Sequence, residues 1–556
     1  MDRITVVAVL CAGLSFLTGN ALTAQSQGVE TLDLRFPGVE WLRYQDASEA
    51  GFSPSRLARA RQFWERRESP ALMIVADGAV VASWGEVDRR FPVHSIRKSL
   101  LSALFGAHMD EIDLDATLAE LGIQDRAQLT PVESGATLRD ILTSSSGVYL
   151  PAVGETADAA DARPARGSRR PGERWWYNNW DFNVAGTIFE RATGKEILSA
   201  LSSSLASEIG MEDWRPGHGF YYSDAEVSAH AGFGTRMSTR DLARFGWLYV
   251  AGAEWLGNTV VPRVWVEEST SALVEADLDP DLGNSYGYMW WVDEAGYYAR
   301  GYGGHVVAVY PRERVVVVVR ADTYHDRFLS NRSLRILLDR IREARVSEPV
   351  RSPQLVPLEV DSSPEATPGD QLMWRPYLGE LSLTHSGVTV RVAEVDGGPV
   401  LEYGEGRFDL RPISAGRFIA VDSRDTVTVH LTSDGRIQSI LSEPIIYLEA
   451  AAAARKGEVD EAVEWVSLAV DEFPNSPGPR LNMARALMGI GDRAGARAQL
   501  DTASMLDPSH PDVPRMRRTL RPRWFFPVAG AVALLIIAVI VWNRRTSVAR
   551  EEGDFR

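Results

Sequence analysis

Cysteine is almost absent from this chain of 556 residues, and the one cysteine, Cys11, lies in an apolar stretch near the N-terminus. A mature chain that begins after this stretch has no intramolecular disulfide and no thiol chemistry, even in an oxidising compartment. Basic residues are also outnumbered by acidic ones, 59 against 75, which gives a net charge of −16. This charge argues against a nucleic-acid partner.

Two further kinds of site lack their sequence signals. The nine histidines form no His-x-x-x-His or His-x-His pair, so we expect no metal site and no cofactor. The glycine-rich run Gly301-Tyr-Gly-Gly304 leads into a predicted strand rather than a helix, which argues against a dinucleotide-binding loop. The chain is too long for one ordinary core, so we expect three or more structural units.

Both ends of the chain carry apolar segments. Residues 1–24 have the pattern of a secretory signal peptide, and residues 524–542 are uncharged and long enough to span a bilayer. We therefore expect a single-pass protein of the cytoplasmic membrane, with its bulk on the periplasmic side and residues 543–556 as a cytoplasmic tail. The flanking arginines favour the opposite orientation, because more of them precede the span than follow it. A buried soluble helix is the alternative for the span.

The most informative stretch is residues 91–100, which contain the tetrad Ser95-Ile-Arg-Lys98. A hairpin over residues 72–83, with an Asp77-Gly78 turn, is predicted before it, and an apolar helix after it. A serine in the first turn of a helix lies near free backbone N–H groups that favour a developing anion. A lysine one turn later can take the hydroxyl proton if its surroundings lower its pKa. The alternative for an isolated tetrad is a helix N-cap followed by a solvated lysine.

Two later segments carry residues suited to the same chemistry. Tyr177-Asn-Asn179 lies in a predicted loop before a helix that ends at Gly194. Ala299-Arg-Gly301 begins a set of adjacent strands, in which the glycines allow a close approach of the backbone. Taken alone, Tyr177 is equally explained as one more aromatic residue of a tryptophan-rich core.

Together and in this order, the three motifs resemble those of the serine beta-lactamase-like hydrolases, the branch that includes class C beta-lactamases, penicillin-binding proteins, 6-aminohexanoate-dimer hydrolases and esterases. The resemblance implies an α+β fold, with an α/β sandwich and an all-helical lobe. It also implies that Ser95 is the acyl-accepting nucleophile, that Lys98 and Tyr177 transfer its proton, and that Asn179 orients the substrate.

The third motif departs from the family pattern. Ala299 occupies the position where the family often has a lysine or histidine that helps to bind a substrate carboxylate. Arg300 is adjacent, but neighbouring side chains on a strand point to opposite faces. The resemblance completes the substrate-binding set with Gly301 and with Tyr302, whose backbone N–H joins that of Ser95 in an oxyanion hole. This departure favours a serine hydrolase that cleaves an ester or amide of another kind over one that acts on a β-lactam or a D-Ala-D-Ala peptide.

Other functions remain open at this point. One alternative is a DD-peptidase or beta-lactamase, and another is an inactive hydrolase fold that acts as an envelope scaffold. A Ser-His-Asp arrangement that uses His94 or His305 is disfavoured, because Ser95 already has Lys98 and Tyr177.

The remaining segments predict further units after a hydrolase domain at residues 25–345. Residues 346–370 are rich in Pro, Ser and Glu, a composition that predicts a linker. Residues 371–444 contain short alternating segments with turn signals, which predict a small all-β domain similar to lipocalin-like modules.

Residues 445–512 repeat with a period of 34, which pairs Gly457 with Gly491 and Ala462 with Ala496. This pattern resembles about two tetratricopeptide repeats. Such repeats imply a protein partner, and a helical spacer before the membrane is the alternative. The other expected partners are a small ester or amide substrate and the membrane itself.

Overall fold

The computed structural model describes residues 35–276, 282–325, 327–360, 373–403, 406–507 and 512–520. The predicted signal peptide at 1–24, the predicted span at 524–542 and the tail lie outside these residues. Among the helices of the described ranges, none has both the length and the apolar character that a bilayer crossing requires.

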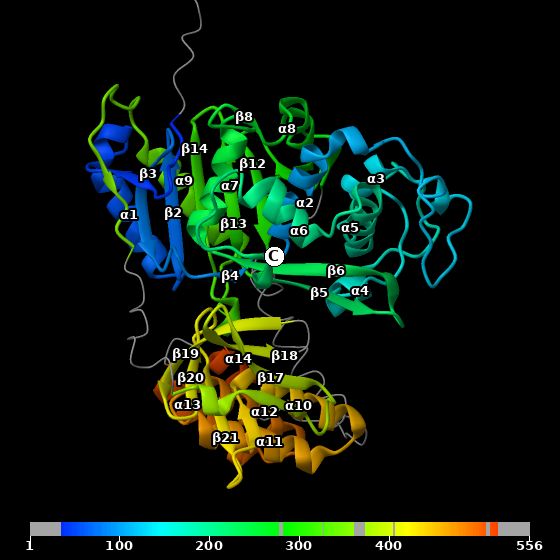
Figure 1. The fold of residues 1–556 in the computed structure, drawn as a ribbon, viewed down its shortest axis with the longest axis vertical. Coiled ribbons are helices and arrows are strands. Elements are labelled where there is room, and N and C mark those ends of the chain that lie inside the picture. The colour runs from blue at the N-terminus through cyan, green and yellow to red at the C-terminus, as the bar shows by residue number, and fades with distance from the viewer. Residues whose placement is uncertain are drawn as a thin grey trace, which may run out of the picture. The chain divides into compact units, whose positions relative to one another are not determined.

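A ten-stranded sheet forms the centre of the first and largest domain (Figure 1). All neighbouring strands are antiparallel except β1 and β3. In spatial order the strands are β15 (Leu355–Pro357), β1 (Leu42–Tyr44), β3 (Ala79–Gly85), β2 (Ala71–Ala76), β14 (Val315–Val319), β13 (His305–Tyr310), β12 (Tyr297–Gly301), β11 (Trp291–Val292), β10 (Ser285–Tyr286) and β9 (Val274–Glu275). The edge strand β15 lies inside the segment predicted as a linker, so part of that segment completes this sheet.

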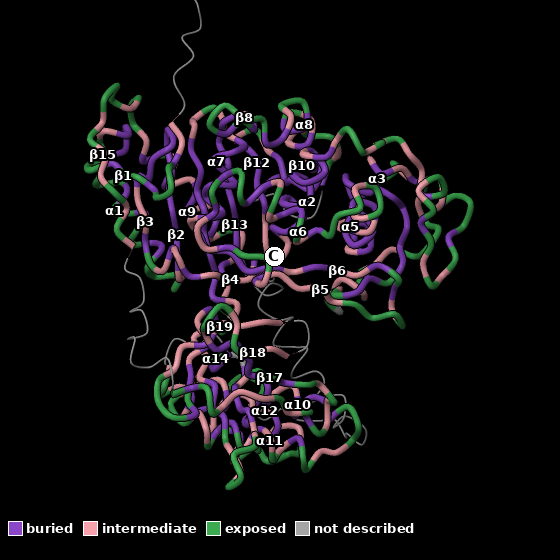
Figure 2. The backbone as a smooth tube through the Cα atoms, viewed as in Figure 1, coloured by how far each residue is buried: buried purple, intermediate pink, exposed green. Residues whose placement is uncertain are grey.

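The central strands β2, β13 and β14 are buried at every position, as the purple tube in Figure 2 shows. A strand that is apolar on both faces needs cover on both faces, which is why these segments show no polar alternation. Helix α7 (Thr239–Val250) packs across β2, β13 and β14, and helices α1 (Pro54–Glu65) and α9 (Asn331–Ala344) pack against each other. The core therefore lies on both sides of the middle of the sheet.

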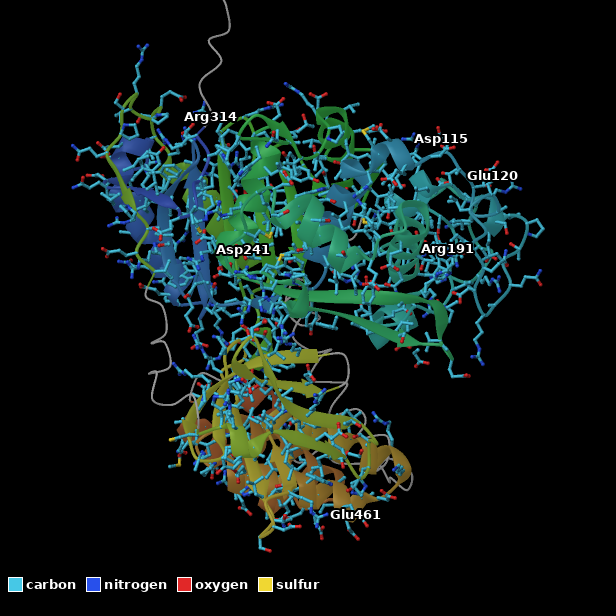
Figure 3. The ribbon with its side chains drawn as sticks, viewed as in Figure 1. Asp115, Glu120, Arg191, Asp241, Arg314 and Glu461 are labelled. Atoms are coloured by element: carbon cyan, nitrogen blue, oxygen red, sulfur yellow. The ribbon has the colours of Figure 1, made fainter. Side chains whose placement is uncertain are left out.

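The predicted hairpin before the tetrad is confirmed. Strands β2 and β3 are joined by Asp77 and Gly78, which both have positive φ, 50° and 77°. Arg314, labelled in Figure 3, lies in the turn between β13 and β14 and forms an ion pair with Asp77. Arg345, at the end of α9, contacts the same carboxylate at 3.0 Å. These contacts join the turns of two hairpins to the last helix of the domain.

The second lobe is mainly helical. Its helices are α2 (Ile96–Ala107), α3 (Leu138–Leu142), α4 (Ala157–Ala162), α5 (Asn179–Thr193), α6 (Ile197–Leu201) and α8 (Arg263–Ser269). A three-stranded sheet, β4 (Phe91–Pro92), β6 (Ser228–Met237) and β5 (Gly219–Asp224), borders this lobe, and β7 (Glu254–Trp255) pairs with β8 (Asn258–Thr259). The expected α+β architecture with a helical lobe is thus confirmed.

The next unit is a seven-stranded antiparallel sheet. Its strands, in chain and spatial order, are β16 (Gly379–Ser382), β17 (Thr389–Val395), β18 (Gly398–Tyr403), β19 (Gly406–Ser414), β20 (Arg417–Ala420), β21 (Thr426–Leu431) and β22 (Ile437–Leu441). The first and last strands also contact each other, so the sheet is nearly closed. Its interior is apolar and includes Val390, Val392, Leu401, Phe418 and Val427.

The C-terminal described unit is a set of antiparallel helices: α10 (Glu443–Lys456), α11 (Val459–Glu472), α12 (Pro477–Gly489), α13 (Arg493–Leu506) and α14 (Asp512–Thr519). The 34-residue repeat has a physical basis here. Gly457 and Gly491 follow the first helix of each pair with φ values of 82° and 88°. Ala462 and Ala496 are buried where the helices pack, because a small side chain lets two helices approach closely.

Candidate active site

Ser95 is the residue at which helix α2 begins. Its backbone is already helical, and its side chain makes no capping hydrogen bond to the helix. Lys98 is only 3% exposed. The alternative of a capping serine followed by a solvated lysine is therefore wrong, because neither side chain has the predicted environment.

Lys98 joins the two hydroxyl groups that the sequence places 82 residues apart. Its Nζ atom lies 2.8 Å from Ser95 Oγ and 2.7 Å from the Tyr177 hydroxyl. The ammonium position also lies over the rings of Tyr177 and Phe182, 4.7 and 4.5 Å from their centroids. A serine, a lysine and a tyrosine thus form one hydrogen-bonded group at the start of α2.

Burial shifts the pKa of both titratable side chains of this group. It lowers the pKa of Lys98 well below the ordinary lysine value, and the charge of Arg97 acts in the same direction. Burial raises the pKa of the Tyr177 phenol, while a hydrogen bond with Ser95 opposes that rise. A neutral amine beside a neutral phenol can accept the serine proton, which a solvated lysine at neutral pH cannot do.

Tyr177 is held by the loop that precedes α5 and by an aromatic neighbour. Ser144, whose φ is positive, donates its hydroxyl to Trp176 O and accepts the backbone N–H of Asn178. The Tyr177 ring stacks on Trp291, with centroids 5.9 Å apart and planes 21° apart. These contacts fix the residues on both sides of Tyr177 and one face of its ring.

The two polar residues predicted beside the substrate differ in their surroundings. Asn179 is half-buried at the first position of α5. The adjacent Asn178 is buried and donates its amide to Val148 O and Asp181 Oδ1. Arg300 lies over the Trp291 ring at 4.4 Å and donates to Leu282 O. It therefore shares the ring cluster of Tyr177, as expected for a side chain that alternates with Ala299 along β12.

Gly301 and Tyr302 bring strand β12 to the nucleophile. A Cβ atom on Gly301 would lie 2.6 Å from Val93 O, so only glycine permits this approach to the segment before Ser95. The Tyr302 ring lies edge-on to His94, with centroids 5.6 Å apart. The oxyanion hole formed by the N–H groups of Ser95 and Tyr302 stays a prediction.

A second polar cluster includes His94, the residue before Ser95. His94, at φ 48°, places Nε2 2.8 Å from Thr323 Oγ1, and His305 Nε2 lies 3.4 Å from the same oxygen. Arg320 donates Nε–H to His305 Nδ1 at 2.9 Å. These contacts join both imidazoles to Thr323 and one of them to Arg320, whereas Ser95 Oγ has the Lys98 amine as its neighbour.

The chain does contain one Gly-x-Ser-x-Gly pentapeptide, at residues 283–287. Its serine, Ser285, lies within strand β10 and pairs with Glu275 and Val292. A nucleophile elbow requires a sharp turn from a strand into a helix. This pentapeptide is therefore part of the sheet and not a second nucleophile.

Sequence reasoning missed three side chains that surround the reactive group: Arg97, Phe182 and Trp291. Arg97 stands inside the tetrad, and a second cation next to the lysine was the available signal. Phe182 and Trp291 belong to aromatic-rich segments whose three-dimensional neighbours no local pattern identifies.

Comparison with known families gives two matches. The beta-lactamase family matches residues 57–340, which is about half of the chain, and the tetratricopeptide repeat matches residues 453–518. The first range contains the whole reactive group, and the second confirms the repeat. A search of curated proteins finds no match.

Solved structures with similar folds were also found. A candidate 6-aminohexanoate-dimer hydrolase from Bacillus anthracis is 19% identical, covering 56% of this chain and 88% of its own, with a TM-score of 0.41. A penicillin-binding protein homologue from Caulobacter crescentus is 16% identical, covering 53% and 98%, with a TM-score of 0.40. A class C beta-lactamase from Rhodobacter sphaeroides is 17% identical, covering 53% and 100%, with a TM-score of 0.38.

Proposed function

The chain belongs to the beta-lactamase family of serine hydrolases, and we propose that it cleaves an ester or amide through an acyl-enzyme on Ser95. The observation that carries this proposal is the position of the Lys98 amine, 2.8 Å from Ser95 Oγ and 2.7 Å from the Tyr177 hydroxyl. A buried amine in that position is both a proton acceptor and a link to a second proton carrier.

The proposed acylation gives each member of the group a role. Lys98 accepts the hydroxyl proton while Ser95 Oγ bonds to the carbonyl carbon. The resulting oxyanion receives hydrogen bonds from the backbone N–H groups of Ser95 and Tyr302. The bond to the leaving group then breaks, Tyr177 protonates the leaving oxygen or nitrogen, and Lys98 returns a proton to Tyr177. Water cleaves the acyl-enzyme by the same transfers in reverse.

The substrate proposal follows from the residue at position 299. Ala299 is fully buried in β12 and offers no charge to a substrate carboxylate. Arg300 lies against Trp291 and donates to Leu282 O, so its guanidinium already has protein contacts. We therefore propose an ester or amide that does not depend on a carboxylate beside the cleaved bond.

A fluorophosphonate probe on the full-length chain tests the nucleophile. We expect labelling at about pH 8 that Ser95→Ala abolishes and that Ser207→Ala, at an exposed serine of the same lobe, leaves unchanged. Equal labelling of the Ser95→Ala chain, or none of the wild type, would contradict an acyl-enzyme on Ser95 and favour an inactive scaffold.

Substrate class needs a separate comparison. We expect p-nitrophenyl esters to be turned over with a higher kcat/KM than nitrocefin or a D-Ala-D-Ala peptide. The reverse order would favour the beta-lactamase or DD-peptidase alternative.

We also propose that the enzyme is anchored in the cytoplasmic membrane through residues 524–542, with its hydrolase domain in the periplasm. The support is the uncharged 19-residue sequence and the signal-like residues 1–24. The tetratricopeptide repeat supports a protein partner as well. Fractionation tests the anchor: the full chain should sediment with membranes, and a chain that ends at residue 520 should not. A full chain recovered free of membranes would contradict it.

A further inference from the structure

Arg97 is a buried cation whose surroundings are aromatic. It is 7% exposed, and its guanidinium carbon lies 5.3 Å from the Phe233 centroid and 5.9 Å from that of Tyr222. Nη2 donates to the Tyr222 hydroxyl at 2.7 Å. Nη1 is buried and has no hydrogen-bond partner among the residues that the structure describes. Burying a charged guanidinium with an unpaired N–H group costs free energy of folding. Packing alone therefore does not explain an arginine at this position.

Tyr222 fixes the position of the Arg97 guanidinium through this hydrogen bond, and the ring of Tyr222 is itself tightly packed. A Cβ atom on Gly232 would lie 2.2 Å from the Tyr222 ring, and one on Gly154 would lie 2.5 Å from it. Two glycines therefore make room for the ring on β5. The Tyr222 hydroxyl accepts the hydrogen bond from Arg97 and so restricts where the guanidinium can lie.

Arg97 and Lys98 are consecutive residues in the first turn of α2, and both are buried. Arginine keeps its proton throughout the pH range in which proteins are folded, whereas a buried lysine gives its proton up readily. When two such cations share one poorly solvated site, the lysine becomes the neutral partner.

We propose that Arg97 is a positioning residue that keeps Lys98 in its unprotonated form, ready to accept the Ser95 proton. The inference rests on the proposed function of Ser95. The fixed positive charge next to Lys98 is that of Arg97, on the same helix α2. Position 299 on β12 holds an alanine and supplies no charge.

The other titratable groups near Lys98 do not cancel the charge of Arg97. Burial raises the pKa of Asp181 well above its usual range, which favours its neutral acid, and burial also raises the pKa of Tyr177 and Tyr286. Arg300, on β12, acts on Tyr177 with the same sign as Arg97. Tyr222 contacts Arg97 through its hydroxyl oxygen, which accepts a hydrogen bond from Nη2. Among these neighbours, all within the described part of the chain, none is an ionised carboxylate that would stabilise a charged Lys98.

The lysine content of the chain makes a direct test feasible. It contains only three lysines, Lys98, Lys195 and Lys456, and the last two are exposed. Lysine-selective isotope labelling of the full chain in detergent micelles should therefore give three side-chain signals, two of which titrate as ordinary references. The third reports the pKa of Lys98 without any turnover.

Arg97→Met and Arg97→Gln both remove the charge, and the glutamine can still hydrogen-bond to Tyr222. In each folded variant we expect the Lys98 pKa, and with it the acid limb of the fluorophosphonate labelling rate, to rise by about 1 to 2 pH units. Tyr222→Phe is the matched control, because it loses the hydrogen bond and keeps the charge. Its acid limb should stay within a few tenths of a unit of wild type.

An unchanged Lys98 titration in both charge-removing variants would overturn the proposal, and so would an equal shift in Tyr222→Phe. Failure of the proposed function has a different signature. In that case the probe does not label wild type at Ser95. The pKa of Lys98 can still be measured from its signal and compared between wild type and the Arg97 variants. Should the methionine variant fail to fold, the glutamine variant supports the same comparison.

Discussion

Along the chain, Ser95 is followed by Lys98 and preceded by His94, and each of these belongs to a cluster that combines a basic side chain with an arginine. In the first cluster Lys98 neighbours Arg97, and in the second His305 accepts a hydrogen bond from Arg320. Burial lowers the pKa of Lys98 and of His305 well below their usual values, and the adjacent arginine adds to the effect in both. In both clusters, burial and a neighbouring arginine thus favour the unprotonated base.

The two clusters differ in what the base can reach. Lys98 Nζ contacts Ser95 Oγ directly. His305 uses Nδ1 for Arg320 and directs Nε2 toward Thr323. A lowered pKa therefore does not identify a catalytic base by itself. Geometry separates a proton acceptor from a side chain that fixes the main chain around it.

Removing the lysine should have the largest effect. Lys98→Met should lower kcat/KM for a p-nitrophenyl ester by about 10² to 10⁴-fold, the usual contribution of a general base. The same variant should be as stable as wild type or more so, because a buried amine is replaced by an apolar side chain. Circular dichroism and the labelling rate together check both outcomes, and labelling at the wild-type rate would remove Lys98 from the mechanism.

The stability gain of Lys98→Met should depend on pH. The folded-state pKa of Lys98 is lowered well below the ordinary value of 10.5, so between these two pKa values the unfolded chain binds more of this proton than the folded chain does. Wild-type stability contributed by this group therefore rises with pH, and the variant should gain more in Tm at about pH 7 than at about pH 9.5. An equal gain at both values would mean that Lys98 keeps its proton on folding.

In the second cluster, Arg320→Met should mainly destabilise the fold. Arg320 is fully buried and donates to Met237 O, Phe91 O and Pro92 O besides His305. Loss of these bonds leaves carbonyl groups unsatisfied, so the free energy of unfolding should fall by about 3 kcal/mol or more. Urea denaturation measures the change, and a variant as stable as wild type would contradict a structural role for this cluster.

Tyr177→Phe should lower kcat/KM by about 10²-fold, because it removes one proton carrier and leaves the stacking on Trp291. The unfolding free energy should change little. The matched control is Tyr324→Phe, at a half-buried tyrosine outside the reactive group, which should leave the rate close to that of wild type.

His94→Gly should have the smallest effect on rate, about 10-fold or less. Glycine adopts the positive φ of this position without strain, while the contact with Thr323 is lost. The acid limb of the labelling rate should not move. A loss as large as that of Lys98→Met would mean that the histidine cluster supplies the base.

Much of the fold near the site is predictable from local pattern. The Asp77-Gly78 turn, the helix that begins at Ser95 and the helix end at Gly194 each depend on a few consecutive residues. The 34-residue repeat is equally local, because it places small residues at helix contacts. The strand β15 was not predictable, since its three residues pair only with β1, more than 300 positions earlier.

The candidate site divides in the same way. Ser95 and Lys98 are one helical turn apart, so the sequence alone determines that their side chains can meet. Whether Lys98 is buried, which neighbours lower its pKa and which face Arg300 presents depend on residues from α5, β11 and β12. Spacing along the chain sets local geometry, but desolvation and charge act through space. The sequence alone therefore predicted Ser95 as the nucleophile, whereas only the tertiary structure determined the surroundings that make Lys98 a base.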